Sequence, residues 1–199
     1  YFKDTVTGSE GKIDSGANEV IGEIAGKGSA SLLTTVYFFN LLHEEGIPTH
    51  FIGIGEEFGF AANTILVKRA KSYKLEVICR EKAWGSFVRR YGDYVKQGDP
   101  LPSLVEFTLK DDARGDPLIT EDALVALKIV PKEAAVHMKK TAQRTTQVIK
   151  NHLAQKGLEL IDIKYEFGEV DGETLIIDEI SGDSMRVVRD GEVLSQNEL

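Results

Sequence analysis

Residues 158–186 read LELIDIKYEFGEVDGETLIIDEISGDSMR, and this stretch decides the fold. It holds two apolar, β-branched runs, 158–167 and 174–180, separated by a segment that contains Asp171-Gly172. An Asp-Gly pair between two such runs is typical of a β-hairpin turn. The stretch therefore predicts an antiparallel hairpin, around which the rest of the chain is organised.

The two faces of the first predicted strand differ in chemistry. Side chains alternate across a strand, so Asp162, Lys164 and Glu166 share one face. The other face carries large apolar and aromatic side chains, namely Ile161, Ile163, Tyr165 and Phe167. We expect the apolar face to lie in the core and the charged face to carry the chemistry.

The register of the hairpin decides which residues meet across it. A three-residue loop, 171–173, places Glu166 opposite Asp178, whereas a two-residue turn places Tyr165 there. Two adjacent carboxylates repel each other unless a cation or proton lies between them, and Mg²⁺ favours one or two carboxylates plus phosphate oxygens. Glu166 and Asp178 are therefore a candidate metal pair. The alternative, which composition alone favours, is a solvated strand face whose charges pair with Lys164.

Two runs carry a resemblance to a known family. Residues 160–168, LIDIKYEFG, and residues 178–186, DEISGDSMR, resemble the signature of SAICAR synthetase (phosphoribosylaminoimidazole-succinocarboxamide synthase) in the order and spacing of their functional side chains. The resemblance implies an α+β fold of antiparallel sheets and helices, in two lobes with ATP in the cleft between them. We expect an N-terminal ATP-binding lobe over 1–72, incomplete at its N-terminus, and a C-terminal lobe over 73–199 with the substrate and metal sites.

The resemblance also implies an activity. SAICAR synthetases join carboxyaminoimidazole ribonucleotide to L-aspartate in purine biosynthesis, with ATP split to ADP and phosphate, so we expect an ATP-dependent ligase that works through an acyl phosphate. In that scheme Glu166 and Asp178 hold Mg²⁺ against the ATP phosphates. Lys164 neutralises charge on the transferring group, and Asp162 orients Lys164 or the imidazole amine.

A second segment offers a phosphate site. A phosphomonoester needs a fork-shaped cation, a hydroxyl and free backbone N–H groups, and Arg80 with the Gly85-Ser86 peptide supplies all three. Surface charge is the alternative interpretation of Arg80. The resemblance implies that Arg80, Ser86 and Arg186 anchor the ribonucleotide phosphate, and that Asp183 supports the site or contacts a substrate.

The chain departs from the family near this site. Glu81 stands where the family usually has Asn, Trp84 replaces a small residue, and Gly182 replaces the usual Pro. The first two departures leave the shape of the ribose pocket open. Together with Gly115, which stands where the family often has His, they keep a ligase of the same fold acting on another carboxylate as an alternative.

Two further segments contribute candidate residues. Residues 110–117, KDDARGDP, form a turn on composition alone, and the resemblance places Lys110, Asp112 and Asp116 near the substrates. The glycine-rich stretch 5–28 is expected to be loop with short extended pieces, and it lacks a complete Walker motif. Lys27 at its end either lies near an ATP phosphate at a helix N-terminus or belongs to a flexible loop with an N-cap.

The remaining pattern predicts the supporting elements. We expect a helix from a Ser29 or Ser31 cap to about Glu45, and a long helix that opens with Pro131 at its first position and ends at Lys156. The spacing predicts that the inner stripe of the long helix consists of Met138, Ala142, Thr145, Ile149 and either His152 or Leu153. Strands are expected at 58–69, 74–79 and 104–110, with a domain boundary at 69–73, and a short helix at Thr120 or Glu121.

Composition limits the class of protein. The 199 residues carry a net charge of −8, which argues against nucleic-acid binding. No apolar run has the length of a membrane span, and the one cysteine, Cys79, rules out an internal disulfide. We expect a cytoplasmic enzyme that binds small molecules and forms either a monomer or a homo-oligomer, with Cys79 as a buried structural thiol.

A non-catalytic nucleotide- or phosphate-binding relative is the alternative function. The family begins with a Gly-Lys-rich strand and turn that cover the ATP phosphates, and residues 1–28 hold no convincing replacement. We expect residues to precede Tyr1 in the natural chain. The given sequence ends at Leu199, short of the long C-terminal helix that the family normally adds.

Overall fold

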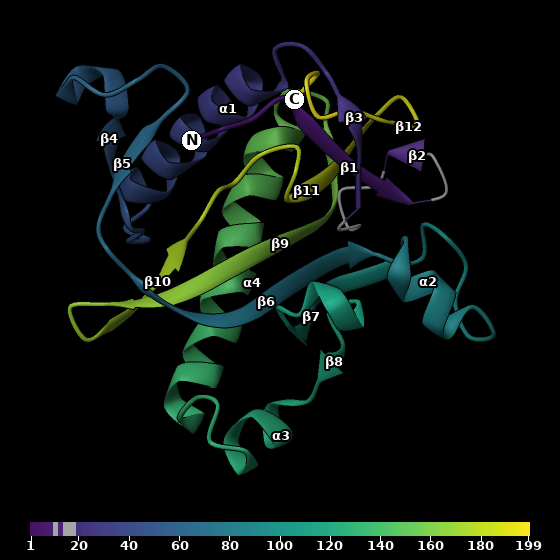
Figure 1. Cartoon of the computed structure of the whole chain (residues 1–199). Coiled ribbons are helices and arrows are strands. Elements are labelled where there is room, and N and C mark those ends of the chain that lie inside the picture. The colour runs from purple at the N-terminus through teal and green to yellow at the C-terminus, as the bar shows by residue number, and fades with distance from the viewer. Residues whose placement is uncertain (10–11, 14–18) are drawn as a thin grey trace.

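A mainly antiparallel sheet forms the centre of the computed structural model, which describes residues 1–9, 12–13 and 19–199 (Figure 1). The described strands of this seven-stranded sheet follow the order β12-β11-β9-β6-β7-β8, and β10 pairs with β9 outside that path. Their bounds are β6 Lys71–Lys82, β7 Pro100–Leu109, β8 Leu118–Ile119, β9 Glu159–Val170, β10 Glu173–Ile177, β11 Met185–Arg189 and β12 Glu192–Val193. The predicted hairpin is β9 and β10.

The hairpin turns over two residues. Asp171 and Gly172 have positive φ angles of 52° and 85°, as the tight hairpin turns require, and Val170 pairs directly with Glu173. The register that relied on a three-residue loop is therefore wrong. Glu166 lies opposite Ile177, where β10 ends.

The segment 178–184 leaves the sheet beside the middle of β9. β11 pairs with the first half of β9 and β10 with its second half, on the same edge. Between the two partners the Lys164 N–H donates to the Ser184 carbonyl oxygen at 2.7 Å. The loop 178–184 is thereby held against the edge of β9 at Lys164.

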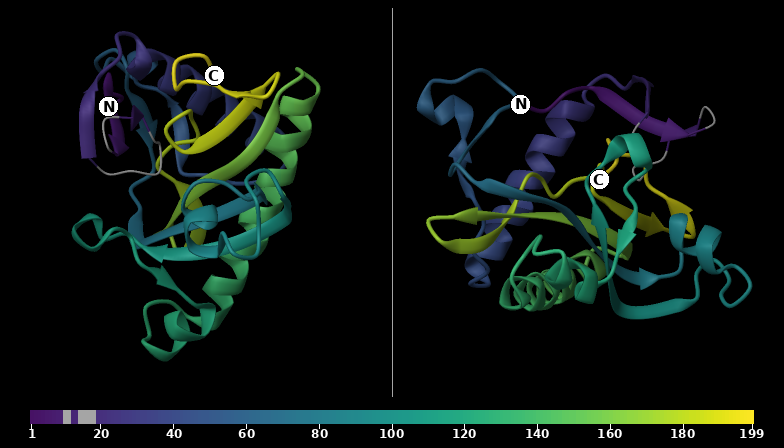
Figure 2. Two further views of the ribbon diagram at one scale, coloured as in Figure 1. Left: turned by 90° about the vertical axis from the view of Figure 1, so that its right-hand side faces the viewer. Right: turned by 60° about the horizontal axis from the view of Figure 1, so that its bottom comes forward.

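The long helix α4 (Lys132–Ala154) covers one face of the sheet, and β1 lies beyond the other face (Figure 2). The predicted inner stripe of α4 is buried, with Leu153 as its last member: Met138, Ala142, Thr145, Ile149 and Leu153. This stripe packs over the apolar side of β9, whose Ile161, Ile163, Tyr165 and Phe167 are all buried. The α+β architecture is confirmed.

The ends of α4 differ slightly from the expectation. Pro131 has extended backbone angles and is the residue before the helix, not its first residue, because its ψ of 153° lies outside the helical region. Gly157, with φ of 71°, lies beyond the helix end at Ala154. The predicted short helix is α3 (Glu121–Ala126), and Thr120 caps it by accepting from the Ala123 N–H.

The helix α1 (Lys27–Glu44) begins earlier than predicted, and neither Ser29 nor Ser31 caps it. The carboxylate of Asp4 takes this role instead. It accepts hydrogen bonds from the backbone N–H of Gly28 at 2.8 Å and of Gly26 at 3.3 Å. A carboxylate at a helix N-terminus satisfies free N–H groups and complements the helix dipole.

The stretch 5–28 is more ordered than the loop that we expected. Its described residues form a three-stranded sheet, with the strands β1 Thr5–Ser9, β2 Lys12–Ile13 and β3 Glu19–Glu23 in the order β2-β1-β3. The part of that prediction at 10–11 and 14–18 lies outside the described residues.

Residues 49–70 contain two short strands where one longer strand was predicted. β4 (Phe51–Ile54) pairs with β5 (Ile65–Val67), and a single 3-10 turn, η1 (Gly55–Phe58), follows β4. The strand predicted at 58–69 is wrong outside β5, because Gly59 and Asn63 have positive φ angles that interrupt it. The division into two lobes at residue 72 stays a prediction.

The other short elements lie around β7. They are α2 (Ser86–Tyr91), which precedes β7, and the 3-10 turn η2 (Asp112–Arg114), which follows it. No helix in the described ranges is long and apolar enough to cross a membrane.

Candidate active site

One face of the central sheet carries rows of polar side chains. On β9 they are Asp162, Lys164 and Glu166, and the paired registers place Arg80 beside Asp162 and Glu76 beside Glu166. On β7, Glu106 and Thr108 extend the rows. The face therefore follows directly from the period-two alternation of three neighbouring strands.

A buried arginine network forms the first row. Arg80 is 1% exposed and donates through Nη1 to Asp162 Oδ2 at 2.8 Å, through Nε to Glu106 Oε2 at 2.8 Å and through Nη2 to Ser86 Oγ at 3.2 Å. Arg186 Nη1 donates to both oxygens of Asp162, at 3.0 and 2.8 Å. Asp162 thus brings together the two arginines that were predicted to bind one phosphate.

The arginine cavity, which lies beside this network, has a volume of about 330 Å³. Four guanidinium groups contribute to its wall, those of Arg80, Arg89, Arg90 and Arg186. A Cβ atom on Gly85 would approach the Arg186 guanidinium to 3.2 Å, and Gly85 has a φ of 51°. Glycine before Ser86 therefore lets the backbone lie close to Arg186, and such a concave cationic site suits a phosphomonoester.

Glu81 points away from the arginine cavity. Its carboxylate accepts from Ser103 Oγ at 2.8 Å and from Lys150 Nζ of α4 at 2.5 Å. Neither Glu81 nor Trp84 is among the described residues that line the cavity. These two departures from the family therefore do not alter this wall directly, whereas the third, Gly115, lines the cavity.

We expect Glu81→Gln to lower stability without affecting substrate binding. The buried carboxylate loses its charge-assisted bond to Lys150, which typically costs about 1–3 kcal/mol. Urea unfolding should show that loss, while the KM for the ribonucleotide stays within about twofold because Glu81 lies behind the sheet. A KM raised tenfold in a folded variant would contradict this placement.

A second cavity, the carboxylate cavity, adjoins the first and also measures about 330 Å³. Both cavities are lined by Glu76, Asp112, Lys164 and Ser184, so they meet at these residues. Every predicted site residue lines one cavity or both: Arg80, Ser86, Asp116, Asp162 and Arg186 the first, Asp112 and Lys164 both, and Lys27, Lys110, Glu166, Asp178 and Asp183 the second. What each residue does there stays a prediction.

Glu166 and Asp178 come together although the register that predicted their meeting is wrong. Asp178 follows β10 with a left-handed backbone, φ 69°, which turns the chain out of the strand. Both residues line the carboxylate cavity. Burial raises the pKa of Glu166, and the negative charge of Asp178 raises it further.

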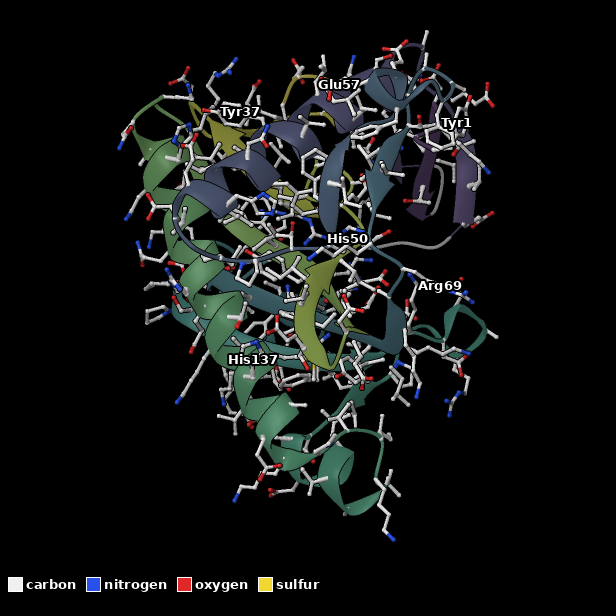
Figure 3. All side chains as sticks on the ribbon, turned by 90° about the vertical axis from the view of Figure 1, so that its left-hand side faces the viewer. Tyr1, Tyr37, His50, Glu57, Arg69 and His137 are labelled. Carbon is white, nitrogen blue, oxygen red and sulfur yellow. The ribbon has the colours of Figure 1, made fainter. Side chains whose placement is uncertain are left out.

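The backbone of Asp178 is held by a histidine, His50. His50 is buried, and its ring Nε2 accepts a hydrogen bond from the Asp178 backbone N–H at 3.2 Å. The backbone N–H of His50 donates to the Ile176 carbonyl oxygen at 3.1 Å. Figure 3 shows His50 beside the C-terminal end of β10. Burial lowers the pKa of His50 to about 4, so its ring is neutral at pH 7.

The carboxylate pair can contribute only part of a metal shell. Within the described ranges, no group of three or more His, Cys, Asp or Glu side chains is arranged to hold a metal ion. Mg²⁺ commonly takes one or two carboxylates and completes its shell with water and substrate phosphates. Glu166 and Asp178 fit that mode.

Lys27 and Asp183, which were predicted separately, form an ion pair. Lys27 Nζ lies 2.5 Å from Asp183 Oδ2 and 2.7 Å from the Thr5 carbonyl oxygen, and Ser31 Oγ donates to the same Asp183 oxygen. The pair connects α1 to the loop 178–184. In that loop, burial raises the pKa of Glu179 to about 7.

Sequence reasoning missed three polar residues of the sheet face, Glu76, Glu106 and Thr108. Glu76 accepts from Lys164 Nζ at 2.7 Å through one oxygen and from Thr108 Oγ1 at 2.8 Å through the other. Lys164 is therefore oriented by Glu76, whereas Asp162 holds the arginines. The alternation of polar and apolar residues in 74–80 and 104–110 could have indicated these three residues. Without knowing how the strands pair, however, it could not show that they share a face with Lys164.

Cys79 should be inert in the folded protein. Its side chain is fully buried, and burial raises the pKa of the thiol to about 11. Because the thiolate is the reactive form, an aromatic disulfide reagent at pH 8 should modify Cys79 only at the rate of unfolding, and rapidly in urea. Complete modification within seconds under native conditions would show that the thiol is accessible.

Comparison with known proteins assigns this α+β fold with its two joined cavities to the ATP-dependent ligases. Within that class, the family model described as SAICAR synthetase matches residues 6–198. The chain belongs to the SAICAR synthetase family.

Relatives support this assignment over the whole chain. Phosphoribosylaminoimidazole-succinocarboxamide synthase from Clostridium tetani is 48% identical over 202 residues, covering 100% of this chain and 87% of the relative. The enzyme of the same name from Thermotoga maritima is 39% identical and covers 98% of this chain and 80% of the relative.

Solved structures agree in fold. A SAICAR synthetase in complex with ADP matches with a TM-score of 0.85 and 32% identity, covering 98% of this chain and 79% of that one. SAICAR synthetase from Pyrococcus horikoshii matches with a TM-score of 0.83 and 32% identity, covering 98% of this chain and 81% of that one.

Proposed function

We propose that the protein joins carboxyaminoimidazole ribonucleotide to L-aspartate at the expense of ATP, to give SAICAR, ADP and phosphate in purine biosynthesis. The observation that carries the proposal is the junction of the arginine cavity with the carboxylate cavity at Lys164. A phosphorylated substrate in the first cavity and a nucleotide at the second would meet there. The names of the relatives and the ADP complex of a related structure support the assignment.

In this proposal the ribonucleotide phosphate binds to Arg80, Ser86 and Arg186. These residues lie on different elements, and the Arg80 contacts to Asp162 and Glu106 hold its guanidinium in place. Binding energy from the phosphate, which does not react, would position the imidazole carboxylate near Lys164.

The nucleotide phosphates bind beside Glu166 and Asp178, which would hold Mg²⁺. A bound Mg²⁺ supplies charge neutralisation for phosphoryl transfer. The ammonium group of Lys164, held by Glu76 at 2.7 Å, stabilises negative charge on the substrate carboxylate and the transferring phosphoryl group. Lys110, Asp112 and Asp116 complete the substrate site, and Lys27 holds Asp183.

The reaction then has two chemical steps. The ATP γ-phosphoryl group passes to the imidazole carboxylate, which forms an acyl phosphate and releases ADP. The aspartate amine attacks the acyl carbon, the carbon–oxygen bond to phosphate breaks, and the amine loses its proton. Positioning and charge stabilisation account for most of such catalysis.

The wider setting follows from the same proposal. ATP would bind between an N-terminal lobe, 1–72, and a C-terminal lobe, 73–199. The enzyme would act in the cytoplasm on small molecules, as a monomer or a homo-oligomer, without nucleic acid or membrane partners.

ADP release is the direct test. ATP and Mg²⁺ should yield ADP only when carboxyaminoimidazole ribonucleotide and L-aspartate are both present, and the product should be SAICAR by mass. ADP formation with another carboxylate in place of the ribonucleotide would favour a ligase of different specificity. Nucleotide binding without turnover, in a chain of full natural length, would overturn the ligase and favour the non-catalytic relative.

A further inference from the structure

Lys110 reaches into the carboxylate cavity from a loop. It follows β7 directly, and its N–H donates to the Lys74 carbonyl oxygen at 3.0 Å, which fixes the backbone at this point. Its Nζ forms an ion pair with Glu166 Oε1. The Lys110 side chain is 43% exposed and that of Glu166 is 11% exposed, so a largely solvent-facing lysine contacts a largely buried carboxylate.

Three carboxylates act on the Lys110 ammonium. Burial lowers the pKa of Lys110, but the hydrogen bond to Glu166 and the charges of Glu166, Asp178 and Glu76 outweigh that effect and raise it. Conversely, the contact with Lys110 opposes the rise in the pKa of Glu166. Lys110 therefore supplies positive charge to the same pair that is proposed to hold the metal.

The second lysine of the cavity is held differently. Lys164 Nζ pairs with Glu76, and Glu76 is fixed in turn by Thr108 Oγ1 at 2.8 Å and is itself buried. Lys110 precedes the short 3-10 turn η2, and its ammonium contacts Glu166, a partner on the sheet face. The geometry thus separates a fixed lysine, Lys164, from an exchangeable one, Lys110.

We propose that Lys110 and the metal–nucleotide complex compete for Glu166, so that metal binding displaces the Lys110 ammonium and frees it to contact the substrates. The competition follows because both cations would bind the same carboxylate, whose Oε1 the Lys110 ammonium already contacts. Mg²⁺ needs a carboxylate oxygen at about 2.0–2.1 Å, and a second cation cannot keep its hydrogen bond to that oxygen without strong repulsion. This inference rests on the proposed function for the identity of the metal pair.

The exchange would make the availability of Lys110 depend on metal binding. Lys110 remains on Glu166 until the metal–nucleotide complex arrives, so its charge becomes available to the substrates only in the loaded enzyme. Removing the ammonium should therefore tighten metal binding and slow turnover. If Lys110 had only a structural role, its replacement would lower both the metal affinity and the turnover rate. A higher metal affinity together with a lower turnover rate therefore identifies the exchange.

Metal binding can be measured without turnover. Electron paramagnetic resonance with Mn²⁺ as the probe, in the presence of ADP at pH 8, should give a dissociation constant about tenfold lower for Lys110→Met than for the unaltered protein. That factor is the order expected when a neighbouring unit charge is removed at a partly solvated site. Lys110→Arg keeps the charge and should leave the constant within about twofold.

The matched control is Lys140→Met, which removes one positive charge from the exposed face of α4. It should leave Mn²⁺ binding and turnover within about twofold. If Lys110→Met unfolds, Lys110→Gln makes the same comparison, with thermal unfolding as the check on folding. Mn²⁺ binding that is unchanged or weaker in the folded Lys110 variant overturns the exchange.

The binding measurement separates this inference from the proposed ligase. Tighter Mn²⁺ binding in Lys110→Met supports the exchange even if carboxyaminoimidazole ribonucleotide is not a substrate. If the protein is an active ligase and Lys110→Met leaves the Mn²⁺ affinity unchanged, the proposed function stands and the exchange is excluded. With turnover present, the kcat of Lys110→Met should fall by at least about tenfold while the metal concentration for half-maximal rate decreases.

Discussion

Glu166→Gln and Asp178→Asn should each lower the rate of ADP formation by at least ~100-fold, which is the usual cost of removing a main charge-stabilising group. Both substitutions keep the shape of the side chain and remove one negative charge from the pair. Because the nucleotide phosphates and Mg²⁺ are proposed to bind there, the metal concentration for half-maximal rate should rise as well. Initial rates at varied Mg²⁺ and saturating substrates give both quantities.

Glu169→Gln is the control for this pair. Glu169 lies on the same strand as Glu166, is exposed, and is replaced in the same way, so its rate should stay within about twofold. If either Glu166→Gln or Asp178→Asn keeps more than a third of the rate at low Mg²⁺, the two carboxylates do not hold the metal as proposed.

Asp162→Asn should have the largest effect on stability. Asp162 is 3% exposed and accepts from both Arg80 and Arg186, so the substitution leaves two guanidinium groups close together with less compensating charge. Breaking a buried pair by neutralising one partner typically costs about 3–5 kcal/mol, and the contact from Glu106 to Arg80 favours the lower end of that range. Urea unfolding at pH 7 measures the loss.

Stabilisation by bound ribonucleotide shows whether the network of Arg80, Asp162 and Arg186 binds phosphate or is purely structural. The ribonucleotide phosphate would bring negative charge to the two arginines, so saturating ribonucleotide should stabilise Asp162→Asn by more than it stabilises the unaltered protein. Asp190→Asn, which changes an exposed carboxylate, should lose less than about 0.5 kcal/mol. Equal stabilisation of both proteins by the ribonucleotide would argue that its phosphate binds elsewhere.

Local periodicity accounts for what could be predicted without the structure. Alternation in 158–167 correctly assigned Asp162, Lys164 and Glu166 to one face, and helical spacing correctly assigned the stripe of α4. These patterns are properties of a single element, since burial on one side selects apolar residues at period 2 or 3.6. The resemblance then identified residues that the structure brings to two joined cavities.

Contacts between distant elements account for what was missed. The cap of α1 comes from Asp4 on a preceding segment, and the partner of Lys164 is Glu76, which lies 88 positions away along the chain. Both pairs depend on how separate elements meet, which no local pattern records. The predicted serine cap failed for that reason.

The sequence alone determined the hairpin and the charged face of β9, because period and turn chemistry are encoded locally. The candidate acids and cations came from the resemblance of its motifs to a known family. Only the tertiary structure decided how Glu166 and Asp178 meet. They do so through the left-handed backbone of Asp178 and its bond to His50, and not through strand register. It also decided that Glu81 faces α4 and that Lys110 contacts Glu166, since both depend on packing between elements that are far apart in the chain.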